Sequence, residues 1–260
     1  MRGAAEAVPV RKTEFGGGNK MKAFFRLMLS DMRKLFNIKT VLISAAAFIL
    51  AVAVLARNGA GDSFVIYVTG GFLPEEQDNL QQLVAALAEY TGLTACIGYI
   101  TQTDNARRMQ VLMRCRNSAR LYCANTAQSG VLCALWSTAG FIVTLVCCVI
   151  KNCLTADAVI TAASGAGLQL FAGCALAQLI LALNCASLRV EAVCAISIIT
   201  VLLQLCFGGA APWLPIAAAS LRRINAGTAS AGLCIGVNFG AWAALYISGL
   251  LLSVKRAGAR

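Results

Sequence analysis

Histidine is absent from this 260-residue chain, and the sequence contains no Cys-x-x-Cys pair. Without histidine, the chain cannot form a Ser-His-Asp triad or the histidine-based zinc sites of metalloproteases. The twelve cysteines lie mostly within apolar runs, where they behave as small hydrophobic residues. The phosphate-binding pattern G-x-x-x-x-G-K-[ST] is also missing. We therefore predict that the chain is not an enzyme, that it holds no cofactor or metal, and that any ATP hydrolysis belongs to a separate subunit.

Charged residues are scarce as well. They make up 13% of the chain, whereas soluble proteins carry about 25%. The mean hydropathy is +0.74, and the apolar residues form long runs that are typical of membrane-spanning helices. The net charge of +11 does not indicate nucleic acid, because the basic residues flank apolar runs and there act as topology signals and lipid-headgroup contacts. The predicted partner of these residues is the lipid bilayer.

Five apolar runs are long enough to predict membrane spans, and a sixth is less regular. The five lie at about 40–56, 129–150, 158–183, 192–207 and 233–254. The sixth, at about 83–100, contains Glu89 and two glycines, so its assignment depends on where the positive charges fall. The predicted fold is an all-α polytopic membrane protein with six transmembrane helices and an N-terminal amphipathic interfacial helix.

The distribution of Lys and Arg favours six spans. With six spans and an inner N-terminus, 18 of the 22 basic residues lie inside, and only Arg57, Lys151, Arg222 and Arg223 lie outside. With five spans the distribution becomes 12 inside and 10 outside. Cytoplasmic loops carry the excess of Lys and Arg, so we predict a bacterial cytoplasmic (inner) membrane protein with both termini in the cytoplasm.

The remaining segments have distinct compositions. Residues 1–20 are either a disordered tail or lie upstream of the true start at Met21, and residues 21–39 alternate apolar and basic positions as in an interfacial helix. In the first outer loop, "SFVIYVT" predicts a short strand, and Pro74 followed by acidic residues predicts the start of a helix. We predict that residues 101–128 form a cytoplasmic coupling loop and that residues 255–260 form a cytoplasmic tail.

The loop 101–128 is the most basic part of the chain. The stretch "RRMQVLMRCRNSARLY" holds five arginines in sixteen residues. Asp104, the pair Leu112-Met113, Arg120 and Tyr122 fall where the permeases of type-2 ATP-binding-cassette (ABC) exporters have an acidic residue, a leucine pair, an arginine and a tyrosine. The family's Gly-Thr and turn proline are replaced here. Together with the layout of spans over 21–260, this pattern resembles the permease subunit of an ABC exporter.

The resemblance implies that the cytoplasmic segment docks on an ATPase subunit and transmits its closure. The residues that this assigns to coupling are Arg107, Arg108, Leu112, Arg114, Arg116, Arg120 and Tyr122. It also implies a second permease subunit, as a homo- or heterodimer, and ATP with Mg²⁺ on the ATPase. The alternative is that the arginines only fix topology and contact lipid phosphates.

Two further features are candidates for function. Glu89 is a carboxylate inside an apolar run, which predicts either an intramembrane polar site or a position near the outer interface. Gly232, Gly236 and Gly240 form a row at four-residue spacing that favours close helix packing, within the chain or across a dimer. Between the last two spans, "GGAAPWLPIAAASLRRI" is typical of a re-entrant or interfacial segment.

The function that we predict is the membrane-spanning permease subunit of an ABC exporter, which moves a substrate that the sequence does not identify. Two other classes stay open: a membrane immunity or sensor protein that only binds, and an ATP-independent secondary transporter. The secondary transporter would depend on Glu89 and would work without nucleotide.

Overall fold

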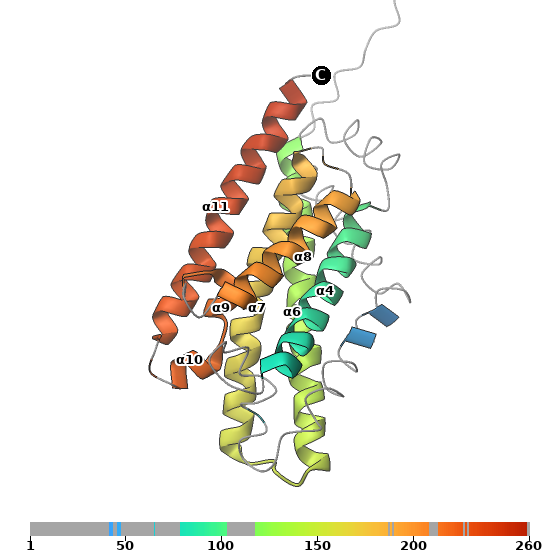
Figure 1. Cartoon of the computed structure of the whole chain (residues 1–260). Coiled ribbons are helices and arrows are strands. Elements are labelled where there is room, and N and C mark those ends of the chain that lie inside the picture. Colours follow the sequence, from blue (N-terminus) through green and yellow to red (C-terminus); the bar gives the residue numbers. More distant parts are fainter. Residues whose placement is uncertain are drawn as a thin grey trace, which may run out of the picture.

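The computed structural model describes residues 42–43, 46–47, 65, 79–102, 118–186, 188, 190–207, 213–225, 227 and 229–258 (Figure 1). All secondary structure in these residues is helical. The helices are α4 (Asn79–Gln102), α6 (Ser118–Ile150), α7 (Ala156–Cys185), α8 (Val190–Phe207), α9 (Pro215–Ala218), α10 (Leu221–Asn225) and α11 (Ala231–Gly258).

Three of these helices are long and apolar enough to cross a membrane: Ser118–Ile150, Ala156–Cys185 and Ala231–Lys255. Two shorter apolar helical stretches, Leu83–Gly98 and Glu191–Cys206, accompany them. The chain is therefore a helical, membrane-associated protein, as its composition predicts. Five of the six predicted runs coincide with described helices in their bounds, and three of these helices are long enough to span a membrane. One start differs: α6 begins eleven residues before the predicted run at 129–150.

Other predictions fall outside the described residues or touch them in a few places. The tail 1–20, the interfacial helix 21–39 and most of the span 40–56 lie outside. Of the predicted strand "SFVIYVT", the structure describes Val65 alone, and this residue is helical rather than extended. Residues 118–128, which belong to the predicted loop 101–128, form the first turns of α6.

The long helices alternate in direction, so their connections gather at two ends (Figure 1). The end of α4, the start of α6, the connection from α7 to α8 and the C-terminal end of α11 lie together at the upper end. The turn from α6 to α7 lies at the lower end, beyond the level of α9. We call the upper end the basic end, because it carries Arg120 and Lys255. We call the lower end the hairpin end, because the turn that joins α6 to α7 lies there; this turn carries Lys151.

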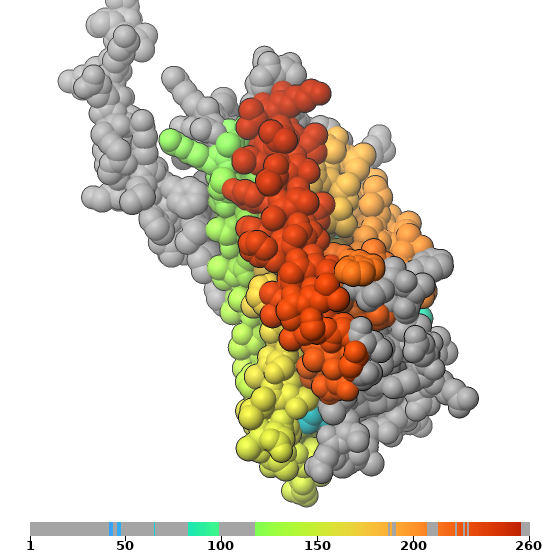
Figure 2. All heavy atoms as spheres, turned by 90° about the vertical axis from the view of Figure 1, so that its left-hand side faces the viewer, coloured from blue at the N-terminus to red at the C-terminus, as the bar shows by residue number. Residues whose placement is uncertain are grey.

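Helix α7 lies at the centre of the bundle and α11 lies on its outside. In the apolar window of α7, 61% of the residues are buried, compared with 11% for α11. Figure 2 shows α11 as a ridge along the surface. The main core joins α4, α6, α7 and α8 through Leu93, Ile97, Leu132, Trp136, Leu176, Ile180, Val193 and Val201.

The turn between α6 and α7 ends one helix and begins the next within five residues. Asn152 has a left-handed backbone (φ 53°), which asparagine tolerates better than most residues. Its N–H donates to the carbonyl of Val149 at 3.1 Å, and the N–H of Cys153 donates to the carbonyl of Cys148 at 3.0 Å. These two bonds are the Schellman pattern, which satisfies carbonyls that the end of a helix leaves unpaired.

Helix α7 then starts with a side-chain cap. The Thr155 hydroxyl accepts a hydrogen bond from the N–H of Ala158 at 3.1 Å, and the backbone of Thr155 is extended, as an N-cap requires. Asp157 lies in the first turn, where the helix dipole favours a negative charge. The turn is thus specified by local sequence at both sides.

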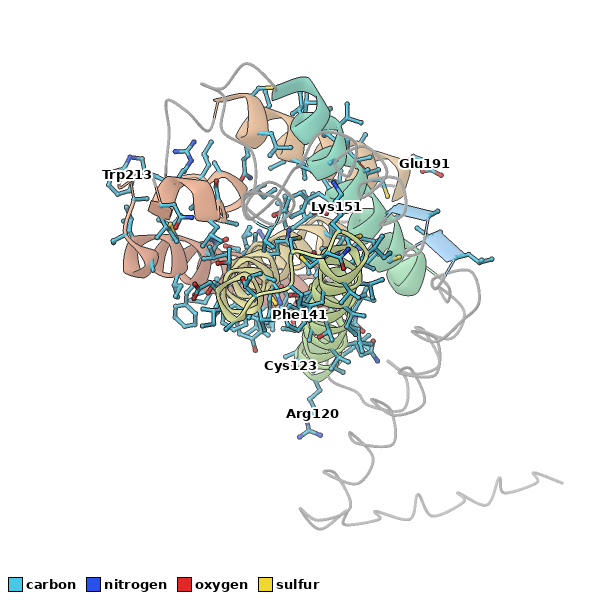
Figure 3. The ribbon with its side chains drawn as sticks, turned by 90° about the horizontal axis from the view of Figure 1, so that it is seen from below. Arg120, Cys123, Phe141, Lys151, Glu191 and Trp213 are labelled. Atoms are coloured by element: carbon cyan, nitrogen blue, oxygen red, sulfur yellow. The ribbon has the colours of Figure 1, made fainter. Side chains whose placement is uncertain are left out.

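The segment between α8 and α11 folds into the bundle instead of lying on its surface. Ile216, Ala217, Ala218 and Ala219 are buried, whereas Trp213 before them is 65% exposed (Figure 3). Leu214 supplies no side-chain cap for α9. The side chain of Gln204 in α8 takes this role, since its Oε1 accepts from the N–H of Ile216 at 2.8 Å. This arrangement agrees with a re-entrant segment, in which protein groups satisfy the irregular backbone.

Candidate functional site

Two of the seven candidate coupling residues, Arg120 and Tyr122, lie at the basic end. Arg107, Arg108, Leu112, Arg114 and Arg116 fall outside the described residues, so the structure describes only Arg120 and Tyr122 of the predicted set. Arg120 is exposed and projects from the start of α6 away from the other helices (Figure 3). Tyr122, two residues later, is 3% exposed. The first turn of α6 therefore has one residue that faces outward and one that is fixed in the bundle.

Tyr122 joins α6 to the two neighbouring helices. Its hydroxyl donates to Oε1 of Gln178 in α7 at 3.0 Å, and Gln178 is 1% exposed. Its ring lies 5.8 Å from the ring of Tyr246 in α11, measured between centroids. The Tyr246 hydroxyl lies 3.3 Å from Sγ of Cys123, close enough for a hydrogen bond. We call Tyr122, Cys123, Gln178 and Tyr246 the basic-end cluster.

Glycine makes the close approach of α11 to this cluster possible. A Cβ placed on Gly249 would lie 2.5 Å from Cζ of Tyr122, which is far inside van der Waals contact. Leu181 and Cys185 of α7 complete the buried surroundings of Tyr122. A displacement of the first turn of α6 would therefore act directly on both α7 and α11.

Glu89 forms a second polar contact, midway along the helices. Nε2 of Gln169 in α7 donates to Oε2 of Glu89 in α4 at 3.4 Å, a long hydrogen bond. Glu89 lies about 15 Å along the helix axis from Asn79 and about 20 Å from Gln102. The carboxyl group of α4 is thus joined to α7 by an amide.

The spacing of the glycine row in α11 predicts close packing against another helix, but no described helix packs there. Apart from the backbone of α11 around each glycine and its two chain neighbours, no described atom lies within 4 Å of a Cβ placed on Gly232, Gly236 or Gly240. Close helix contacts within the described chain occur at other glycines. A Cβ on Gly92 would meet Ala47 and Trp136, and one on Gly173 would meet Leu93. A helix that packs on the row of α11 would have to come from outside the described residues.

Several residues of the site were not predicted from the sequence. Gln169 and Gln178 are polar residues inside the apolar run 158–183, and this position was the signal that could have marked them. Tyr246 carried no such signal, because tyrosine is common near membrane interfaces. In the part of the chain that the structure describes, no group of three or more Cys, Asp or Glu side chains could hold a metal ion.

The chain was also compared with known proteins. No family model matches it, and neither a curated protein nor a solved structure does. The arrangement of its own residues is therefore the basis for assigning a function to this helical, membrane-associated protein.

Proposed function

We propose that this chain is the permease subunit of an ABC exporter in the bacterial cytoplasmic membrane. It crosses the membrane six times with both termini in the cytoplasm, and it acts as a dimer with two ATPase subunits, which bind ATP and Mg²⁺. The basic end faces the cytoplasm because lipid membranes sort Lys and Arg to that side. The alternating directions of the described helices support this arrangement, since they bring the ends of the basic segment and the C-terminal end of α11 together.

The observation that carries the proposal is the length of α6 and its attachment. Its 33 residues extend about 50 Å, whereas the hydrocarbon core of a bilayer is about 30 Å thick. One continuous helix can therefore span the membrane and still extend beyond it. At the basic end, Arg120 is exposed, and Tyr122 connects the same turn to α7 and α11. A coupling element needs these two properties: an accessible tip and a rigid connection to the spans.

The proposed mechanism follows from these connections. Closure of the ATPase subunits displaces the first turn of α6, and the basic-end cluster passes this displacement to α7 and α11. Helices α4 and α8 pack together in the main core through Leu93, Ile97, Val193 and Val201, so they respond as a unit. Rigid-body motion of these two spans and the first span along the dimer interface then switches access from one side of the membrane to the other.

Affinity purification of the full chain in mild detergent tests the proposal. We expect an ATPase subunit with a Walker phosphate loop to co-purify, and we expect Arg120→Glu or Arg116→Glu to weaken its recovery without reducing membrane insertion. Lys151→Glu at the hairpin end is the matched control and should leave recovery unchanged. Normal insertion with no nucleotide-binding subunit in any preparation would contradict the proposal.

A second candidate function rests on the contact between Glu89 and Gln169. An ionisable group between two spans is a common site for a coupling proton or a substrate, which favours an ATP-independent secondary transporter. In that case, Glu89→Gln would abolish transport, and transport would persist in vesicles without nucleotide. In an exporter driven by ATPase subunits, Glu89→Gln would retain transport, and transport would stop in vesicles without nucleotide.

A further inference from the structure

Two cysteines meet at the turn from α6 to α7. In a Schellman cap, the third residue from the helix end and the second residue after the cap are brought together, and they commonly make a hydrophobic contact. Here these positions hold Cys148 and Cys153, and the 3.0 Å hydrogen bond from the Cys153 N–H to the Cys148 carbonyl fixes the two backbones side by side. The capping geometry, and not chance proximity, therefore places one thiol next to the other.

The two side chains also face each other. Their thiols are close enough to form a hydrogen bond, and both side chains belong to one buried cluster with Val65, Ala158 and Ala162. Cys148 is fully buried, whereas Cys153 is 8% exposed and is flanked by the exposed residues Asn152 and Leu154. Cys153 is thus the thiol that a reagent from solution would reach first.

We propose that Cys148 and Cys153 form a disulfide in the native membrane, which fastens the α6–α7 turn. The inference rests on the orientation in the proposed function, because that orientation places the hairpin end on the outer side of the membrane. Disulfides form and persist in such oxidising compartments and are rare in the cytosol. Lys151 and Asn152, between the two cysteines, keep the turn at the polar boundary of the helices.

The bond forms by exchange with a disulfide, either of an oxidoreductase or of a small molecule, as the oxidant. The Cys153 thiolate attacks one sulfur of the oxidant, which forms a mixed disulfide and releases the first thiolate. The Cys148 thiolate then attacks Sγ of Cys153 and releases the second thiolate. The two cysteines lose two electrons and two protons, and the oxidant takes up both as it is reduced to two thiols.

Alkylation of intact cells with N-ethylmaleimide, followed by denaturing purification of the full chain, tests the inference. The reagent stays present during denaturation, so that every free thiol reacts, including Cys147 beside Cys148. We expect Cys148 and Cys153 to be unalkylated, their peptide to weigh two hydrogen atoms less than the form with both thiols free, and these two positions to become alkylated only after reduction. Cys133 and Cys174 provide an internal control, since their thiols also contact each other but lie midway along α6 and α7. They should remain free thiols in the same sample, which excludes oxidation during handling.

A reporter of orientation separates the two ways in which the inference can fail. In a background with all twelve native cysteines changed to serine, Asn152→Cys should react with a membrane-impermeant maleimide applied to intact cells. If it reacts while both native cysteines are recovered alkylated without reduction, the disulfide is disproved and the proposed function stands. If it does not react and both cysteines are alkylated, the disulfide fails together with the orientation on which the proposed function depends.

Discussion

Gly249 lies where α11 passes over Tyr122 of α6, and Gly236 lies on the same helix with no described atom near its missing Cβ. The two glycines therefore predict opposite effects for the same substitution. Gly249→Ala forces a methyl group against the Tyr122 ring, and overpacking of this kind costs about 1–3 kcal/mol. Gly236→Ala adds no clash and removes a flexible residue from a helix, which changes stability by about 0.5–1 kcal/mol in the favourable direction.

The free energy of unfolding, measured by SDS titration in mixed micelles, distinguishes these outcomes. Gly249→Ala should lower it, and Gly236→Ala should leave it equal or raise it. A similar loss in both variants would show that the row at Gly232, Gly236 and Gly240 packs against a helix that the described residues do not include.

The hydrogen bond between Glu89 and Gln169 also predicts how single-residue changes affect stability. Substitution of either residue by leucine leaves the other polar group without its partner between two helices, which costs about 1–3 kcal/mol. The double variant leaves no unpaired group, so its loss should be smaller than the sum of the single losses. At 3.4 Å the bond is long, and we expect a coupling free energy of about 0.5–1 kcal/mol.

A double-mutant cycle by SDS titration measures this coupling. Losses that add would show that Glu89 and Gln169 do not stabilise each other, and would remove the structural support for the second candidate function. Gln178→Leu on the same helix is a suitable reference, because its partner is Tyr122 and not Glu89.

At the scale of elements, hydrophobic runs predicted the position of most helices that the structure describes. The predicted spans 158–183, 192–207 and 233–254 lie within α7, α8 and α11, and each helix extends beyond its run by a few residues. Helix α6 starts much earlier than its run because residues 118–128 mix polar with apolar residues, which interrupts the apolar run, but contain no glycine or proline that would end the helix. A search for apolar runs detects only the part of a helix that lipid surrounds.

Apolar runs could not predict which residues of different helices contact each other. Glu89 and Gln169 lie 80 residues apart in the sequence, and the residue that occupies the space beside Gly249 belongs to another helix. Spacing along one helix, such as the row from Gly232 to Gly240, identifies a face that permits close packing. It does not identify whether a neighbour is present, since that depends on the arrangement of the whole bundle.

The connection between α8 and α9 permits a test at this scale. Gln204→Ala removes the acceptor for the N–H of Ile216, which α9 does not otherwise cap with a side chain. Loss of such a capping bond costs about 0.5–2 kcal/mol, and we expect faster amide hydrogen exchange at Ile216, Ala217 and Ala218. Thr200→Val is the control on the same helix, because its hydroxyl bonds only to the carbonyl of Ile196 within α8. Equal exchange in both variants would show that Gln204 does not hold α9.

At the scale of the whole molecule, the direction of every helix depends on which end faces the cytoplasm. The hairpin end exposes a short turn with Lys151 as its only basic residue between α6 and α7, whereas Arg120 and Lys255 lie at the opposite end. The end of α4 at Gln102 and the start of α6 at Ser118, which bracket the basic stretch of the sequence, lie at that same end (Figure 1). Lipid membranes retain such positive loops on the cytoplasmic side, so the basic end should be inaccessible from outside an intact cell.

Single cysteines at the two ends test this orientation directly. Both Arg120→Cys and Asn152→Cys replace exposed residues, so a difference in labelling reports the side of the membrane and not burial. With all twelve native cysteines changed to serine, a membrane-impermeant maleimide applied to intact cells should label Asn152→Cys and spare Arg120→Cys, and permeabilisation should make Arg120→Cys reactive. Labelling of Arg120→Cys in intact cells would show that the basic end faces the outside of the cell. The tip of α6 could then not reach a cytoplasmic ATPase, and the exporter function would be excluded.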